Sequence, residues 1–144
     1  MKNIFETDPE SHYRFSWDFK VSVNVSWRQF AQEKFVQDVC DILEEEYFPA
    51  SNLILELTEH CQALDEQILK WHIAEFHKYG VGISADDFGS GYSSLNMLKD
   101  IDADVLKLDM KFLDLNPENN DKGVIIITAV LDMARQLDIP AIAE

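Results

Sequence analysis

Short apolar stretches alternate with longer amphipathic stretches along the chain from about residue 20 onward. In the short stretches apolar residues fill most positions or recur at every second one, as in strands buried in a sheet. In the longer stretches they recur every three or four residues, as on one face of an α-helix. The pattern predicts strands at residues 20–26, 52–59, 81–87, 104–109 and 139–144. It predicts helices at residues 27–46, 64–80, 93–98 and 122–137.

Local signals support several of these boundaries. Ser26 is a predicted N-cap, and Gly80 is a predicted helix stop because glycine readily adopts the left-handed conformation found there. The buried face of the first helix is expected to hold Phe30, Phe35, Val39, Ile42 and Leu43. That of the second is expected to hold Ile68, Leu69, Trp71, Ile73 and Phe76. We expect His72 and His77 on its solvated face.

Each predicted strand carries a polar residue near its carboxyl end. These residues are Asn24, Glu56, Asp86, Lys107 and Glu144. Their spacing suits repeated strand-helix units and predicts an α/β fold, a partial (β/α) TIM-type barrel with about five parallel strands. A doubly wound sheet is the alternative, although it binds ligands only where its strand order reverses.

The chain is short for a complete barrel of this kind. It has 144 residues, whereas such a barrel needs roughly 200 to 250. We therefore expect an incomplete portion of a barrel, a barrel completed by another copy, or an open fold.

Composition narrows the possible partners and the location. With 47% hydrophobic residues the chain is expected to fold, and its net charge of −15 argues against binding to DNA or RNA duplexes. No apolar run is long enough for a membrane span, so we expect no membrane contact. Cys40 and Cys61 lack metal-type spacing and are expected to be reduced core thiols of a cytoplasmic protein.

The richest stretch in candidate chemistry is GVGISADDFGSGYSSL, residues 80–95. Asp86 and Asp87 end a strand, where neighbouring carboxylates can serve two cations or one bridged pair. Gly89 and Gly91 allow close approach to a phosphate, and Ser93 and Ser94 can cap the next helix.

The strand-end residues predict a metal centre. The carboxylates of Glu56, Asp86, Asp87 and Glu144, if brought together beside the Asn24 amide, would repel one another strongly without cations. Oxygen ligands favour Mg²⁺ or Mn²⁺ over Zn²⁺. Lys107 on the same rim is a candidate to hold an attacking water or to stabilise developing negative charge.

These stretches together resemble the central part of an EAL domain, a bacterial phosphodiesterase that linearises cyclic di-GMP. The matching stretches are SVNVS, LELTE, ADDFGSGYSSL, DVLKLD and the terminal AIAE. No Glu-Ala-Leu, the sequence that names the family, precedes Asn24.

The resemblance implies a role for each matching residue. Asn24, Glu56 and Asp86 would hold one metal, Asp86 would bridge to a second held by Asp87 and Glu144, and Lys107 would support the hydrolytic water. Glu59 would anchor the loop that follows Asp87. The residues of that loop assigned to substrate or loop contacts are Gly89, Ser90, Gly91, Tyr92, Ser93 and Ser94.

The expected function follows from the resemblance. Residues 20–144 would form a truncated EAL-like barrel domain after an N-terminal segment, 1–19, that is helical or irregular. The domain would hydrolyse cyclic di-GMP to linear pGpG with two Mg²⁺ or Mn²⁺ ions, as a homodimer or higher oligomer. The alternative is an inactive EAL-like sensor of cyclic di-GMP or a dimerisation scaffold.

Each candidate residue also has a purely structural interpretation. Asp86 and Asp87 suit a solvated turn or helix cap, and Asn24 suits a satisfied core amide. Lys107 suits a side chain extending from a strand end to water, and Glu59 suits a helix cap.

Overall fold

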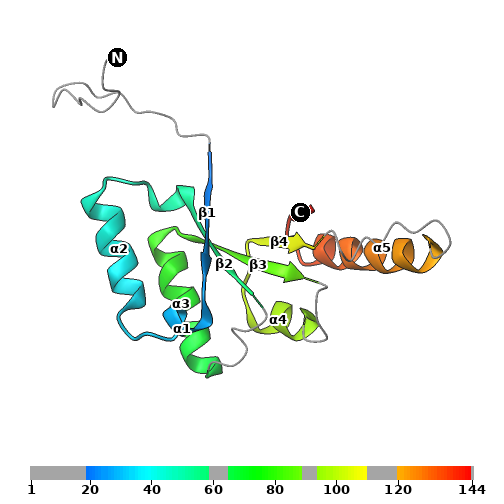
Figure 1. Ribbon diagram of the computed structural model, residues 1–144, viewed down its shortest axis with the longest axis horizontal. Helices are drawn as coiled ribbons and strands as arrows, with labels where there is room; N and C mark the ends of the chain where they lie inside the picture. Colours follow the sequence, from blue (N-terminus) through cyan, green and yellow to red (C-terminus); the bar gives the residue numbers. More distant parts are fainter. Residues whose placement is uncertain (1–18, 59–64, 89–93, 110–119, 144) are drawn as a thin grey trace, which may run out of the picture.

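Five parallel strands form one sheet in the computed structural model, which describes residues 19–58, 65–88, 94–109 and 120–143. The strands are β1 (Val21–Val25), β2 (Leu53–Leu57), β3 (Gly82–Phe88), β4 (Val105–Leu108) and β5 (Ala141–Ala143). Each strand pairs with the next one along the chain (Figure 1). This order confirms the predicted parallel α/β fold, and no reversal of the doubly wound kind occurs among the described strands.

The helices connect consecutive strands. They are α1 (Trp27–Phe30), α2 (Phe35–Glu45), the 3₁₀ turn η1 (Ala50–Asn52), α3 (Glu66–Tyr79), α4 (Ser94–Asp100) and α5 (Asn120–Gln136). Helices α2 and α3 contact each other, and α5 lies at the opposite end of the sheet in Figure 1. Among the described residues, no helix has the length and apolar character needed to cross a membrane.

The predicted single helix over residues 27–46 is wrong, because the chain breaks between α1 and α2. In one continuous helix, Phe30 and Phe35 would point about 140° apart around the axis. The break brings their ring centroids to 5.8 Å, and both rings also contact Phe76 of α3. Burial of this aromatic cluster therefore outweighs the continuity of the helix.

The capping signals at the helix ends are confirmed. Ser26 accepts a hydrogen bond from the Gln29 backbone N–H, and the Gln29 side chain accepts one from the Ser26 N–H. Gly80 ends α3 in the left-handed conformation, with φ of 91°. At the start of α3, the Asp65 carboxylate accepts hydrogen bonds from the backbone of Gln67 and Ile68.

The buried face of α3 differs from the prediction. Ile68 and Trp71 are 45% and 51% exposed, whereas His72, predicted on the solvated face, is only 2% exposed. The buried residues are Leu69, His72, Ile73 and Phe76. They follow the spacing of a single narrow helical stripe, so His72 takes a core position that Trp71 was expected to fill.

Helix α2 buries the predicted positions fully or partly, with one exception. Ile42 is 57% exposed, and the buried residues are Val36, Cys40 and Leu43. Burial of Cys40 confirms it as a core thiol, whereas Cys61 lies outside the described residues.

His77 is also less exposed than predicted, because it joins α3 to the sheet. Its Nε2 lies 3.0 Å from Asp104 Oδ2, and the same oxygen accepts a hydrogen bond of 2.7 Å from the Ile83 backbone N–H. The contact therefore links the end of α3 to the start of β3 and to the residue before β4.

Burial of His72 predicts a specific loss of stability in mild acid. Desolvation lowers the pKa of His72 below its usual 6.5, although a hydrogen bond with the Phe30 backbone opposes the shift. The unfolded chain therefore takes up a proton near pH 6.5 that the folded chain does not. The free energy of unfolding should fall as the pH drops through 6.5, and His72→Phe should remove this part of the decrease.

Urea unfolding of both proteins at about pH 7.5 and about pH 5.5, on either side of the usual histidine pKa, measures the difference. Equal loss of stability in the two proteins would contradict the assignment.

Candidate functional site

A buried ion pair joins two of the predicted strand-end residues. Lys107 Nζ, on β4, donates a hydrogen bond of 2.8 Å to Glu56 Oε1, on β2. The side chain of Lys107 is only 10% exposed and that of Glu56 is 4% exposed. Lys107 therefore does not extend into solvent as the structural interpretation required, and its charge is neutralised inside the protein.

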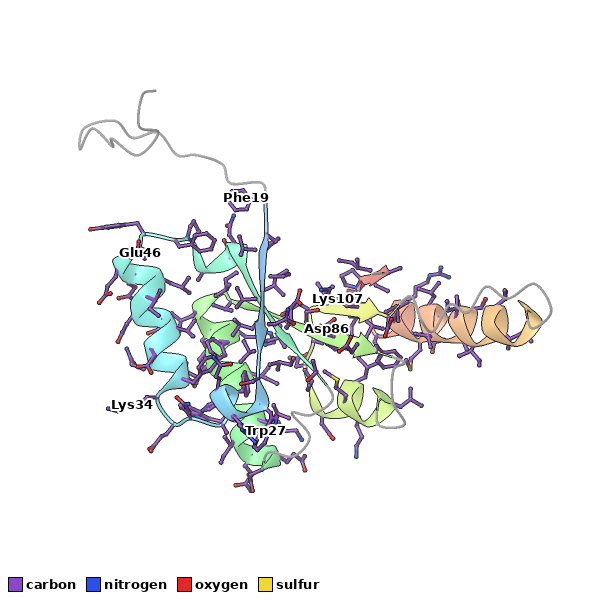
Figure 2. The ribbon with its side chains drawn as sticks, in the orientation of Figure 1. Phe19, Trp27, Lys34, Glu46, Asp86 and Lys107 are labelled. Carbon is purple, nitrogen blue, oxygen red and sulfur yellow. The ribbon has the colours of Figure 1, made fainter. Side chains whose placement is uncertain are left out.

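Asp86 completes this cluster from β3, the strand between the other two. Its Oδ1 lies 3.9 Å from Lys107 Nζ, and its side chain is 15% exposed. Figure 2 shows Asp86 and Lys107 close together, on β3 and β4. Because Asp86 lies within β3 and is mostly buried, the interpretation as a solvated turn is wrong for this residue.

The local environment disfavours a charged Asp86. Burial raises the pKa of its carboxyl, while a hydrogen bond from the Asp87 backbone and the charge of Lys107 only partly oppose the rise. A carboxylate held in this way would be stabilised by additional positive charge.

Asn24 lies beside Glu56, because the two residues are paired in the register of β1 and β2. Paired residues of parallel strands point to the same face of the sheet. Asn24 is exposed, so it is not a satisfied core amide. Its amide is thus available on the same face as the Glu56 carboxylate.

Asp87 is placed by an irregularity in β3. The register with β4 shifts between Ala85 and Phe88, and Asp87 has a φ of 55°. Aspartate tolerates this left-handed conformation better than most residues. The irregularity leaves Asp87 exposed while Asp86 is largely buried, so the two adjacent carboxylates have different environments.

Several predicted site residues lie outside the described residues. They are Glu59, Gly89, Ser90, Gly91, Tyr92, Ser93 and Glu144. Helix α4 begins at Ser94, but the side chain of Ser94 is also outside the description.

Ser84 was missed by the sequence analysis. It pairs with Glu56 in the register of β2 and β3, and it is 1% exposed. Within the described part of the chain its hydroxyl has no hydrogen-bond partner. The sequence could have indicated Ser84, because it lies two residues before Asp86 and alternate residues of a strand share a face.

The donor chemistry suits a hard cation, although the described part of the chain does not contain a complete site. No group of three or more His, Cys, Asp or Glu side chains in that part is arranged to hold a metal ion. Glu56, Asp86 and Asn24 nevertheless offer oxygen ligands from three adjacent strands, the type that Mg²⁺ and Mn²⁺ prefer. Burial raises the pKa of Asp86, so a cation bound there would favour its charged form.

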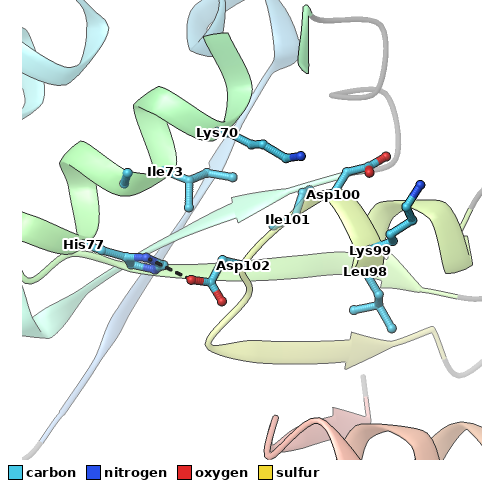
Figure 3. Close-up of a pocket in the computed structure, with 9 residues that line it drawn as sticks. Lys70, Ile73, His77, Leu98, Lys99, Asp100, Ile101 and Asp102 are labelled. Carbon is cyan, nitrogen blue, oxygen red and sulfur yellow. Dashed lines mark ion pairs between the residues drawn. The ribbon is translucent and has the colours of Figure 1, made fainter. Parts of the chain in front are cut away.

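A cavity of about 330 Å³ lies elsewhere, between α3 and the segment from α4 toward β4. Lys70 and His77 line it from α3, and Asp102 lines it from the other side (Figure 3). His77 Nδ1 lies 3.8 Å from Asp102 Oδ2. The cavity shares no residue with the strand-end cluster. Basic and acidic side chains both line it, so it does not offer a set of oxygen ligands like that of the cluster.

Comparisons of the sequence and the fold with known proteins identify related EAL domains. The EAL domain model matches residues 9–144. The Pseudomonas aeruginosa protein named bifunctional diguanylate cyclase/cyclic di-GMP phosphodiesterase MucR is 36% identical over 127 residues, which make up 88% of this chain and 18% of that protein.

Solved structures show the same relationship. The EAL domain of Mycobacterium smegmatis DcpA has a TM-score of 0.79 and 31% identity, over 86% of this chain and 55% of that chain. A structure titled PaMucR phosphodiesterase, c-di-GMP complex, has a TM-score of 0.75 and 35% identity, over 88% of this chain and 51% of that chain.

The chain thus spans less than a fifth of MucR and about half of the two solved chains. The family model covers nearly all of its sequence, and the neighbouring structures have the same fold. This chain belongs to the EAL domain family.

Proposed function

We propose that this chain forms the catalytic rim of an EAL-type domain that hydrolyses cyclic di-GMP to linear pGpG. The observation that carries the proposal is the convergence of Glu56, Asp86 and Lys107 from the carboxyl ends of three adjacent parallel strands. Carboxyl ends of strands are where barrel enzymes place their catalytic groups. The names of the MucR relative and of the solved MucR complex support cyclic di-GMP as the substrate.

The proposed metal ligands follow the family resemblance. Asn24, Glu56 and Asp86 would hold one Mg²⁺ or Mn²⁺, and Asp86, Asp87 and Glu144 would hold a second. Metal ions in such a site activate water and neutralise charge on the phosphodiester. The placement of Asn24 opposite Glu56 and the burial of Asp86 support this assignment for the described ligands.

Lys107 would stabilise the charge that develops during hydrolysis. A water oxygen bonds to phosphorus while the bond from phosphorus to one ribose oxygen breaks, and the departing oxygen receives a proton. The Lys107 ammonium can donate a hydrogen bond to a phosphate oxygen or orient the water. Because Lys107 is largely buried, such a bond would be stronger than in bulk water.

Further parts of the proposal concern residues outside the described ranges. Glu59 would anchor the loop after β3. The loop residues, Gly89 to Ser94, would contact substrate through backbone N–H groups that the glycines leave accessible. Residues 20–144 would form the EAL-like domain, in a cytoplasmic protein.

A second candidate function is a cyclic di-GMP sensor or dimerisation scaffold without catalysis. The observation in its favour is that the described residues hold no group of three acidic or histidine ligands suited to a metal.

Self-association is also part of the proposal. Val21 and Val23 on β1, which lies at one edge of the five-stranded sheet, are 37% and 43% exposed. Val124, Ile125 and Ile126 on α5 are also exposed, by 53%, 65% and 47%. Burying these apolar side chains and pairing the sheet edge would favour a homodimer or higher oligomer.

The proposed activity predicts the effect of neutralising either carboxylate. In the protein that contains this chain, Glu56→Gln or Asp86→Asn should lower cyclic di-GMP hydrolysis by about 100-fold or more, because each removes a metal ligand. The formation of pGpG with Mg²⁺ or Mn²⁺, measured by chromatography, gives the rate. Asp132→Asn on the exposed surface of α5 is the matched control and should keep the rate. Absence of hydrolysis by the folded, unaltered protein with either ion would refute the catalytic proposal.

Calorimetry distinguishes the two candidate functions. The catalytic domain should bind cyclic di-GMP with Ca²⁺, a hard cation used here in place of the catalytic ion, and should release pGpG when Mg²⁺ replaces it. Binding with no turnover under either condition would favour the sensor, and no binding would favour the scaffold.

The exposed apolar residues predict concentration-dependent association. Sedimentation of the chain should show a dimer or larger species, and replacing Val23 and Ile125 with Lys should shift it toward monomer. Circular dichroism controls for folding of the variant. A monomer at every concentration tested for the unaltered chain would contradict this part of the proposal.

A further inference from the structure

Lys107 lies close to two of the proposed metal ligands. Its ammonium is 2.8 Å from a carboxylate oxygen of Glu56 and 3.9 Å from one of Asp86. These two residues come from β2 and β3, and Lys107 comes from β4. A positive charge from the chain itself therefore lies between the carboxylates assigned to the first metal.

Burial of these three side chains affects the stability of the folded protein. The three side chains are 4%, 15% and 10% exposed for Glu56, Asp86 and Lys107 respectively. Two buried carboxylates without a cation would repel each other and would lack the hydration that they have in the unfolded chain. Lys107 supplies one compensating charge, together with a hydrogen bond to Glu56.

The same contact opposes the binding of a metal ion to the Glu56 carboxylate. A divalent ion bound to Glu56 Oε1 would lie close to an ammonium that is hydrogen-bonded to that oxygen, and the two positive charges would repel strongly at low dielectric. The ammonium and the ion would therefore compete for the Glu56 carboxylate through the repulsion of their charges.

We infer that Lys107 is an internal substitute for the first metal ion, and that metal binding displaces its ammonium from Glu56. The inference rests on the proposed function, since it takes Glu56 and Asp86 as metal ligands. In the metal-free protein Lys107 holds the carboxylates together. In the metal-bound protein the freed ammonium becomes available to the reacting phosphate and water.

The two sides of Lys107 differ in burial. Lys107 is paired in register with Ile142 of β5, which is 51% exposed, whereas Glu56 on the other side is buried. A lysine has a long, flexible stem, so its ammonium can change partners without a shift of the strand.

Two consequences follow for metal binding. The affinity for Mg²⁺ or Mn²⁺ is lower than the same carboxylates would give without Lys107, because the ion competes with an existing ion pair. Lys107 also becomes available for catalysis only when the first metal has bound. The position of the lysine ammonium therefore depends on whether the metal site is occupied.

Lys107→Met tests the competition directly, since it keeps most of the stem and removes the charge. Titration calorimetry with Mn²⁺ alone, without nucleotide, measures the affinity of the full chain. The variant should bind Mn²⁺ at least about tenfold more tightly than the unaltered chain, because the competing charge is gone. Its melting temperature should be lower without metal, and saturating Mn²⁺ should raise it by more than it raises that of the unaltered chain.

Lys78→Met is the matched control. Lys78 also forms an ion pair with a glutamate, Glu75, but its side chain is 69% exposed. This variant makes the same change in net charge as Lys107→Met, so it accounts for any general increase in attraction of cations to the acidic chain. It should leave the Mn²⁺ affinity unchanged.

A measurement on the unaltered chain covers the case in which Lys107→Met does not fold. Nitrogen-detected NMR of the lysine side chains should show a protected Lys107 ammonium without metal, since buried ion-paired ammonium protons exchange slowly. Saturating Mg²⁺ should remove this protection or shift the signal. An unchanged Lys107 signal at saturation would overturn the inference.

The outcomes also separate this inference from the proposed function. Mn²⁺ binding that is equal or weaker in a folded Lys107→Met variant would overturn the competition and leave the metal site itself standing. Failure of both the unaltered chain and the variant to bind Mn²⁺ would instead refute the proposed metal site, and the inference with it.

Discussion

Pairing of consecutive parallel strands is the constraint on which the rest of this structure depends. Because every described strand runs in the same direction and pairs with its neighbour in sequence, the carboxyl ends of all five strands lie along one edge. Residues separated by one strand-helix unit therefore become neighbours in space. Asn24 meets Glu56 through the register of β1 and β2, and Lys107 reaches Glu56 across β3. Without that order, the polar residues would be scattered single groups with no shared chemistry.

Placing charges at that edge has an energetic consequence. The ion pair between Lys107 and Glu56 is buried, and a buried pair seldom stabilises a fold more than apolar residues of similar volume would. Removing one partner, however, leaves the other charged and desolvated, which typically costs about 3–5 kcal/mol. Apolar residues of similar volume often stabilise a fold as well as such a pair does, so stability alone does not account for it.

Much of the fold could be predicted from the sequence, because the strands are apolar and the caps are local. Ser26 and Gly80 act within a few residues of themselves, and the structure confirms both. The break between α1 and α2 could not be predicted in this way. It depends on Phe30 and Phe35 both packing against Phe76, a contact between residues more than 40 positions apart in the sequence. His72 was misplaced for a similar reason, since the orientation of α3 on the sheet selects which stripe is buried.

The site, like the fold, could be predicted from the sequence only where it depends on local spacing along the chain. Strand-end spacing identified Glu56, Asp86 and Lys107 as neighbours, but it did not indicate that Lys107 pairs directly with Glu56. That contact depends on side-chain length and on how deeply the strands bury each group. The irregularity in β3 depends in turn on the pairing of Ala85 and Phe88 with β4, and it gives adjacent aspartates different exposure. A sequence can thus specify which residues share an edge, while the packing of that edge decides which of them neutralise one another. In this chain that second level of organisation pairs Lys107 with Glu56, a contact that strand-end spacing alone does not show.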